Sequence, residues 1–143
     1  MFILDTDHLG IIQQLAGAEF GNLARRMREH RLEDFFVTIV SFHEQVAGWN
    51  AYIHGARDSE RVVRGYAMFE SILSGFAAMN LLSFDSEAAR TFAELRKSRV
   101  RVGTMDLRIG AIGLVRRFTV LTRNTTDFTR IPGLRVEDWT LAF

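Results

Sequence analysis

The sequence of 143 residues contains no cysteine. This absence excludes disulfide frameworks, thiolate zinc sites and thiol nucleophiles, and it is typical of proteins kept in a reducing compartment. The N-terminal segment also lacks a basic region followed by a long apolar run, because the chain reaches an acid at Asp5. We therefore expect a cytoplasmic protein with neither a signal peptide nor a membrane span.

Three common sequence motifs are missing as well. Neither of the glycine-rich phosphate-binding patterns, G-x-x-x-x-G-K-[ST] and G-x-G-x-x-G, occurs in the chain. His43-Glu44 begins like the zinc-protease motif H-E-x-x-H, but Ala47 stands where the second histidine is required. The other histidines are scattered along the chain, and we expect His8, which follows Asp7, to be the one nearest a substrate.

The charges of the chain are unevenly distributed, although the formal net charge is only +1. Residues 1–89 carry 7 basic and 12 acidic side chains, whereas residues 90–143 carry 11 and 5. This asymmetry suits a protein that holds an anionic polymer on one surface and processes it at another, although solvated surface charge is an equally ordinary explanation. Lys97 is the single lysine, and arginine, which supplies the other basic side chains, is well suited to phosphate groups.

Short apolar runs that predict buried strands alternate with segments of helical periodicity. The predicted strands cover residues 2–4, 35–40, 81–84 and 118–122. The predicted helices cover two stretches within 8–31, broken near Gly17 and Gly21, followed by 41–54, 59–79, 86–98 and 104–117. This alternation is typical of a parallel sheet with helices on both faces. We predict an α/β fold of one domain, residues 1–143, with a central parallel sheet of four or five strands.

Polar or acidic side chains follow several predicted strands or open the next helix. They are Asp5, Asp7, Glu44, Asp106, Asn124 and Asp127. The carboxyl ends of parallel strands meet at one edge of a sheet, so these side chains could share a site. Two carboxylates about 4 Å apart repel by about 4 kcal/mol at an effective dielectric of about 20, and a cluster of three therefore requires protons or a cation. The pattern predicts a site for Mg²⁺ or Mn²⁺, which take oxygen ligands.

Each acid also has a local explanation. The run from Ser41 to Glu44 fits a capping box, in which Glu44 would only satisfy backbone N–H groups. Asp106 follows Thr104 and could complement a helix dipole, and Asp7 could be an N-cap. Acids in turns are ordinary, which would account for Asp127. The coincidence of all these groups at one sheet edge is what favours a functional site.

Several stretches of the sequence resemble PIN-domain endoribonucleases, and within them the VapC toxins of bacterial toxin–antitoxin pairs. The resemblance covers nearly the whole chain, and its most distinctive part is the closing stretch. The matching segments are 3–7, 41–44, 103–111 and 121–139. The resemblance implies a three-layer α/β/α domain with a central parallel sheet, usually dimeric, that cleaves RNA with Mg²⁺ or Mn²⁺ and has a groove blocked by a cognate antitoxin.

Carried over to this sequence, the resemblance implies that Asp5 and Asp106 are the principal metal ligands and that Glu44 completes the catalytic acids. The fourth acidic position is open between Asn124, which stands where many relatives have an acid, and Asp127, which we count with the metal ligands. Three further residues at the periphery of the predicted active site are Thr6, Asp7 and Ser41. Asp7 departs from the family, which often has asparagine there, and could strengthen a second metal site.

Partner contacts are expected on two further parts of the chain. Arginines of the basic half should guide RNA phosphates toward the acids, and these are Arg99, Arg101, Arg108 and Arg123. The closing stretch resembles that of VapC toxins that cut tRNA, so tRNA is one candidate substrate. The predicted helix at 59–79 presents Tyr66, Phe69, Leu73 and Phe76 at helical spacing, either for core packing or for a homodimer or antitoxin contact.

Two other functions compete with this interpretation. Asp5-Thr6-Asp7 after an apolar strand also resembles the D-x-D motif of haloacid-dehalogenase-like phosphatases, which require a later lysine and a paired acidic motif. The single lysine, Lys97, lies in an arginine-rich helix, and Asp106 has no acidic neighbour. A non-catalytic PIN-like binding module is the other alternative, but the presence of all three core acids argues against it.

Overall fold

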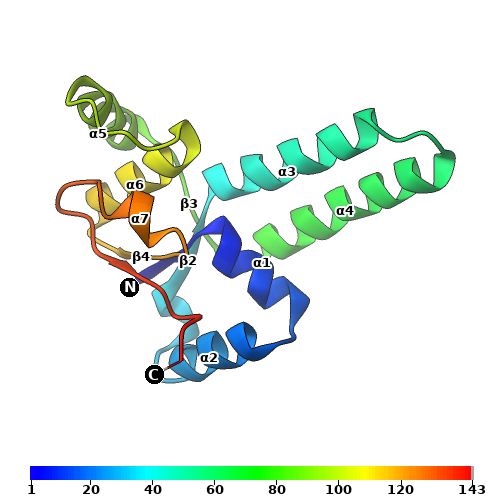
Figure 1. Cartoon of the computed structure of the whole chain (residues 1–143), viewed down its shortest axis with the longest axis horizontal. Helices are drawn as coiled ribbons and strands as arrows, with labels where there is room; N and C mark the ends of the chain where they lie inside the picture. Colours follow the sequence, from blue (N-terminus) through cyan, green and yellow to red (C-terminus); the bar gives the residue numbers. More distant parts are fainter. Residues whose placement is uncertain (143) are drawn as a thin grey trace.

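The computed structural model describes residues 1–142 and is built on a parallel sheet of five strands (Figure 1). The strand order is β3-β2-β1-β4-β5, and every neighbouring pair is parallel. The strands are β1 (Phe2–Leu4), β2 (Phe35–Thr38), β3 (Asn80–Leu82), β4 (Thr119–Leu121) and β5 (Val136–Glu137). This topology confirms the predicted α/β class and the predicted parallel sheet.

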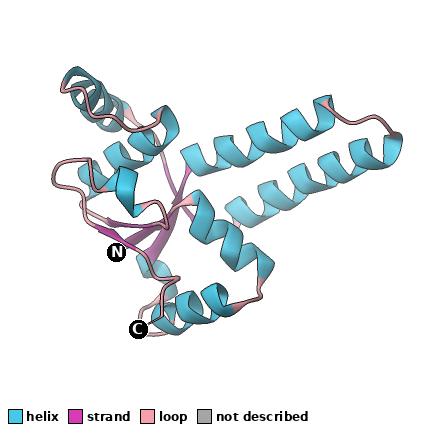
Figure 2. Cartoon of the chain, viewed as in Figure 1, coloured by secondary structure: helices cyan, strands magenta, loops and turns pink. Residues whose placement is uncertain are grey.

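Helices connect the strands and cover both faces of the sheet (Figure 2). The helices are α1 (Thr6–Gln14), α2 (Ala18–Met27), the 3₁₀ turn η1 (Leu32–Asp34), α3 (Ile39–His54), α4 (Ser59–Ala77), α5 (Ser86–Lys97), α6 (Thr104–Arg116) and α7 (Thr125–Phe128). Successive strand residues point to opposite faces, so Ile3 packs in one core with residues of α5 and α6, and Leu4 packs in another with residues of α1, α2 and α4. Two cores on one sheet make the three layers of an α/β/α fold.

Several predicted boundaries differ from those in the structure. Helix α3 begins at Ile39 because the Thr38 side chain accepts a hydrogen bond from the Ser41 N–H at 3.1 Å and caps the helix. Strand β2 therefore ends earlier than predicted, and because the cap is Thr38, the alternative explanation of Glu44 as part of a capping box with Ser41 does not hold. Gly103, rather than Thr104, is the N-cap of α6.

The break between the first two helices lies at Gly17, whose φ of 93° is left-handed. Gly21, predicted as a second breaker, lies inside α2. None of the helices within residues 1–142 combines the length and hydropathy needed to cross a membrane.

Helices α3 and α4 form a long hairpin that projects away from the sheet (Figure 1). They approach closely at Gly65, where an added Cβ would lie 2.3 Å from Ile53 Cγ1. Of the apolar residues predicted for contacts on α4, Phe76 is buried in the core, whereas Tyr66 and Leu73 are 58% and 63% exposed. The helix therefore contributes to the core at its C-terminal end and keeps other large apolar side chains on the surface.

Candidate active site

Three predicted catalytic acids meet at the carboxyl edge of the sheet. Asp5 directly follows β1, Glu44 lies in α3, and Asp106 lies in the first turn of α6. Each offers a carboxylate oxygen, and these oxygens all lie within 4.8 Å of one another. The structure thus brings together residues that are up to a hundred positions apart, as a parallel sheet with following helices requires.

Asp5 is the most buried member of this three-acid group, with 5% of its surface exposed. Its Oδ1 accepts a hydrogen bond from the Thr6 N–H at 2.8 Å, which caps α1, and its Oδ2 accepts one from the Thr122 hydroxyl at 2.8 Å. Burial raises the pKa of Asp5 from 3.8 to about 7, and the negative charge of Asp7 adds to this rise despite the two hydrogen bonds. The carboxylate is therefore held in place but is electrostatically destabilised when charged.

Glu44 and Asp106 are half-buried and have the same electrostatic problem. Burial raises the pKa of Glu44, and the charge of Asp106 adds to this effect, although the Thr6 hydroxyl donates to Glu44 Oε1 at 2.9 Å. Burial also raises the pKa of Asp106, as does the charge of Asp127. All three carboxyl groups thus resist ionisation, as expected of acids that face one another without a cation.

The periphery of this site is built by hydroxyl and amide groups. The Thr6 hydroxyl lies 3.1 Å from the buried Ser41 Oγ, which joins the start of α1 to α3. The Asn124 amide donates to Asp106 Oδ2 and to Asp127 Oδ2, each at 3.1 Å. The Asn124 amide therefore links Asp127 to Asp106 of the three-acid group.

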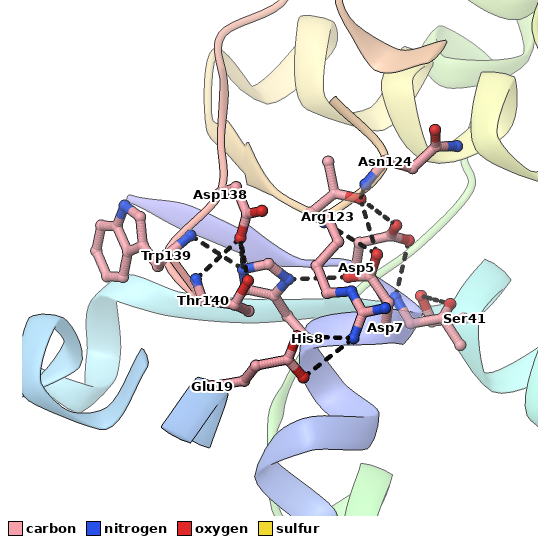
Figure 3. Close-up of polar contacts among 12 residues, drawn as sticks. Asp5, Asp7, His8, Glu19, Ser41, Arg123, Asn124, Asp138, Trp139 and Thr140 are labelled. Carbon is pink, nitrogen blue, oxygen red and sulfur yellow. Dashed lines mark hydrogen bonds and ion pairs between the residues drawn. The ribbon is translucent and has the colours of Figure 1, made fainter. Parts of the chain in front are cut away.

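Asp7 lies beside Asp5, and its hydrogen-bond partners lie outside the three-acid group (Figure 3). Its Oδ1 lies 2.8 Å from His8 Nδ1, and its Oδ2 accepts a hydrogen bond from the Arg123 N–H at 2.9 Å. Burial alone would raise the pKa of Asp7, but the hydrogen bonds from His8 and Arg123 outweigh it and lower the pKa. Asp7 is thus a stably charged neighbour of the site. His8 itself is fully buried, so the expectation that it is the histidine that touches substrate is wrong.

Sequence reasoning missed Thr122, whose buried hydroxyl holds Asp5 and also accepts a hydrogen bond from the Asn124 N–H at 3.0 Å. A signal was present, because Thr122 is a polar residue at the end of the last predicted strand. Its role depends on a contact across 117 positions, which neither composition nor periodicity reveals.

The four arginines predicted to bind RNA have different surroundings. Arg123 is exposed beside the site and forms an ion pair with Glu19 at 3.1 Å. Arg99 and Arg101 are exposed between α5 and α6. Arg108 is half-buried, with its guanidinium 5.5 Å from the Phe92 ring centroid, and it lines a pocket of about 280 Å³ that also includes His43.

The three-acid group fits a hard divalent cation. Its donors are carboxylate oxygens, which Mg²⁺ and Mn²⁺ prefer, and no histidine or thiolate competes within the group. A cation would also favour the ionised form of all three carboxyl groups, against the burial that raises their pKa values and the neighbouring negative charges that add to this rise. Chemistry and electrostatics thus agree on a cation at this position.

The chain is similar in sequence to known endonucleases. No protein-family model matches the chain. It is 35% identical over 91 residues to the tRNA(fMet)-specific endonuclease VapC of Salmonella typhimurium, a match that covers 61% of this chain and 67% of that protein. A protein of the same name from Shigella flexneri is 33% identical over the same shares.

Solved structures extend the likeness to the whole fold. The DNA-bound VapBC complex of Salmonella typhimurium contains a chain that is 25% identical, with a TM-score of 0.69 over 96% of this chain and 97% of that one. FitAB bound to IR36 DNA contains a chain with the same fold, at 23% identity and a TM-score of 0.71, covering 100% of this chain and 98% of that one.

Proposed function

The chain belongs to the VapC ribonuclease family, and we propose that residues 1–143 form one nuclease domain, a metal-dependent endoribonuclease that acts as the toxin of a toxin–antitoxin pair. The observation that carries this proposal is the convergence of Asp5, Glu44 and Asp106, whose oxygens lie within 4.8 Å of one another. Relatives named as endonucleases of the initiator tRNA support RNA as the substrate, with tRNA as the first class to test. Such a toxin would act in the cytoplasm.

The cofactor that we propose is Mg²⁺ or Mn²⁺, held by Asp5, Glu44 and Asp106. When bound, such an ion lowers the pKa of water and stabilises charge on a phosphoryl group. Asp127 is the further carboxylate within reach, and Asn124 would orient it together with Asp106. We assign the fourth position to Asp127, with Asn124 as its positioning amide.

The chain's own residues fix the direction of these carboxylates. Thr122 and the Thr6 N–H each hold one oxygen of Asp5, and the Thr6 hydroxyl holds one oxygen of Glu44. Because these donors are themselves in secondary structure or beside it, the carboxylates need little rearrangement when a cation and substrate arrive. Such preorganisation lowers the cost of assembling charge at a reaction centre.

The haloacid-dehalogenase alternative would have Asp5 and Asp7 share one site as nucleophile and acid. In the structure Asp7 is instead taken up by His8 and the Arg123 N–H, while Asp5 faces Glu44 and Asp106. The arrangement therefore favours a nuclease over a phosphatase of that class.

Two interactions with other proteins belong to the proposal. The solved neighbours are VapBC and FitAB complexes, which supports a cognate antitoxin as the partner. An apolar pocket of about 200 Å³ lies between α3, α4 and β3 and includes Ile39, Leu73 and Leu81, each more than a third exposed. We propose that the antitoxin covers this pocket and that exposed residues of α4 contribute to a homodimer.

Cleavage of end-labelled tRNA tests the nuclease proposal. We expect the wild-type protein to cleave the tRNA with Mg²⁺ or Mn²⁺ and to be inactive in EDTA. Asp5→Asn and Asp106→Asn should each lose cleavage while remaining folded, since they remove charge from a repulsive group. Glu70→Gln, on the exposed side of α4, is the matched control and should cut normally. Cleavage by either Asn variant at the wild-type rate would remove that residue from the site.

A further inference from the structure

His8 on α1 is a fully buried histidine that bridges the acidic edge of the sheet and the C-terminal segment (Figure 3). Its Nδ1 lies 2.8 Å from Asp7 Oδ1, and its Nε2 lies 3.3 Å from the Trp139 backbone nitrogen. A backbone N–H can only donate, so Nε2 must accept. Nδ1 then donates to Asp7, and Asp138 Oδ1 lies 3.7 Å from Nε2.

The other end of Asp7 holds the segment that follows β4. Asp7 Oδ2 accepts a hydrogen bond from the Arg123 N–H at 2.9 Å. The residues on either side of Arg123 orient the predicted metal ligands: Thr122 donates to Asp5 at 2.8 Å, and the Asn124 amide donates to Asp106 at 3.1 Å. A displacement of Asp7 would therefore move the two groups that aim these carboxylates.

The C-terminal segment that contacts His8 is itself held in place by ring packing and by a hydrogen bond to α2. The Trp139 ring packs against Phe2 and His30, with centroids 4.7 and 5.3 Å apart. Thr140 accepts a hydrogen bond from the Asn22 side chain at 2.8 Å, which ties the segment to α2. The histidine thus stands between a rigid aromatic cluster and a half-exposed carboxylate.

We propose that His8 is a positioning residue of the active site, which transmits the position of the C-terminal segment through Asp7 to Thr122 and Asn124. This inference rests on the proposed metal-dependent nuclease. Partners that orient the ligands of a metal typically change metal affinity by about 10- to 100-fold when they are lost. The prediction is therefore a change in metal binding as well as in turnover.

Two substitutions of His8 separate its two hydrogen bonds. In His8→Asn the side-chain amide can take the place of Nδ1–H and still donate to Asp7, but the Trp139 N–H loses its acceptor. In His8→Gln the side-chain carbonyl can reach the place of Nε2 and accept from Trp139, but Asp7 loses its donor. The two lost hydrogen bonds differ in burial and charge, so the two variants can differ in stability, and their metal binding and turnover are compared on folded protein only.

The experiment measures Mn²⁺ binding by electron paramagnetic resonance, and kcat and KM for tRNA cleavage, on variants whose folded fraction is known from urea unfolding. We expect His8→Gln to weaken Mn²⁺ binding by about 10- to 100-fold and to lower kcat with little change in KM, and His8→Asn to lose less than about threefold. The control His54→Gln, at an exposed histidine at the end of α3, should behave like wild type.

Asp7→Ala keeps the test decisive if a His8 variant fails to fold. It should reproduce the loss of His8→Gln, and the double variant should lose no more than either single one, since both act through one carboxylate. Equal Mn²⁺ affinity and kcat in His8→Asn, His8→Gln and wild type, or equal losses in both variants, would overturn the inference. If wild type neither binds Mn²⁺ nor cuts RNA, the proposed function itself fails.

Discussion

The substitution Asp5→Asn is expected to stabilise the metal-free protein, because burial raises the pKa of Asp5 from 3.8 to about 7. Below pH 3.8 the carboxyl is protonated in both folded and unfolded chains, and its contribution to stability is fully present. Between pH 3.8 and 7 the unfolded chain releases the proton while the folded one retains it, so the free energy of unfolding falls as pH rises. At about 1.36 kcal/mol per pKa unit, the total loss above pH 7 is about 4 kcal/mol.

Asparagine has nearly the same shape and carries no titratable proton, so the difference in unfolding free energy between Asp5→Asn and wild type isolates the contribution of Asp5. The measurement is urea unfolding followed by circular dichroism in EDTA, from pH 5 to pH 8. The free energy of unfolding of the variant should exceed that of wild type by a difference that grows with each pH unit up to about 7 and is constant above it. The control Glu70→Gln, at an exposed acid, should show no such trend.

Addition of Mn²⁺ should narrow the difference in unfolding free energy between Asp5→Asn and wild type at pH 7 and above. A cation that binds only the folded state adds about 2.7 kcal/mol at a hundred times its Kd, and the wild-type site should gain this while the variant, short of one ligand, should not. If the difference between variant and wild type stays constant from pH 5 to pH 8 in EDTA, the argument from the buried carboxylate of Asp5 is refuted.

Three further predictions concern RNA, association and the fourth acid. Arg→Gln changes at the predicted RNA contacts, with Arg101 and Arg123 as examples, should weaken RNA binding measured with Ca²⁺ and make the salt slope shallower by about 0.7 per contact; four unchanged slopes would disprove the contacts. Tyr66→Asp should lower the mass in light scattering, because exposed residues of α4 contribute to the proposed homodimer, and an unchanged mass would exclude Tyr66 from that contact. Asn124→Ala should weaken Mn²⁺ binding without unfolding the protein, and an unchanged affinity would exclude its positioning role.

The sheet and the cluster of Asp5, Glu44 and Asp106 could be predicted from the sequence because each signal is local. The apolar runs at residues 2–4 and 35–40 mark buried strands, and the acids that follow strands must lie at one edge of a parallel sheet. The start of α3 could not be decided in the same way. Thr38 and Ser41 are both good N-caps three positions apart, and only the packing of β2 determines which one caps the helix.

The roles of His8 and Thr122 lay beyond sequence reasoning, because their partners are far away in the chain. His8 accepts from Trp139 across 131 positions, and Thr122 donates to Asp5 across 117. A histidine next to an acidic motif looks like a substrate contact when its burial is unknown. Tertiary contacts alone distinguish a buried hydrogen-bonding histidine from an exposed one.

The acidic site and the basic half of the chain, residues 90–143, act on the charge of RNA at different distances. Burial and neighbouring negative charges raise the pKa values of Asp5, Glu44 and Asp106, and in their charged form these carboxylates would also repel an RNA phosphate. A bound cation removes both penalties at the centre but adds little attraction at distances beyond about 10 Å in physiological salt. Long-range attraction must therefore come from other charges, and the basic half supplies arginines beside the site, such as Arg123, which stays exposed even in its ion pair with Glu19.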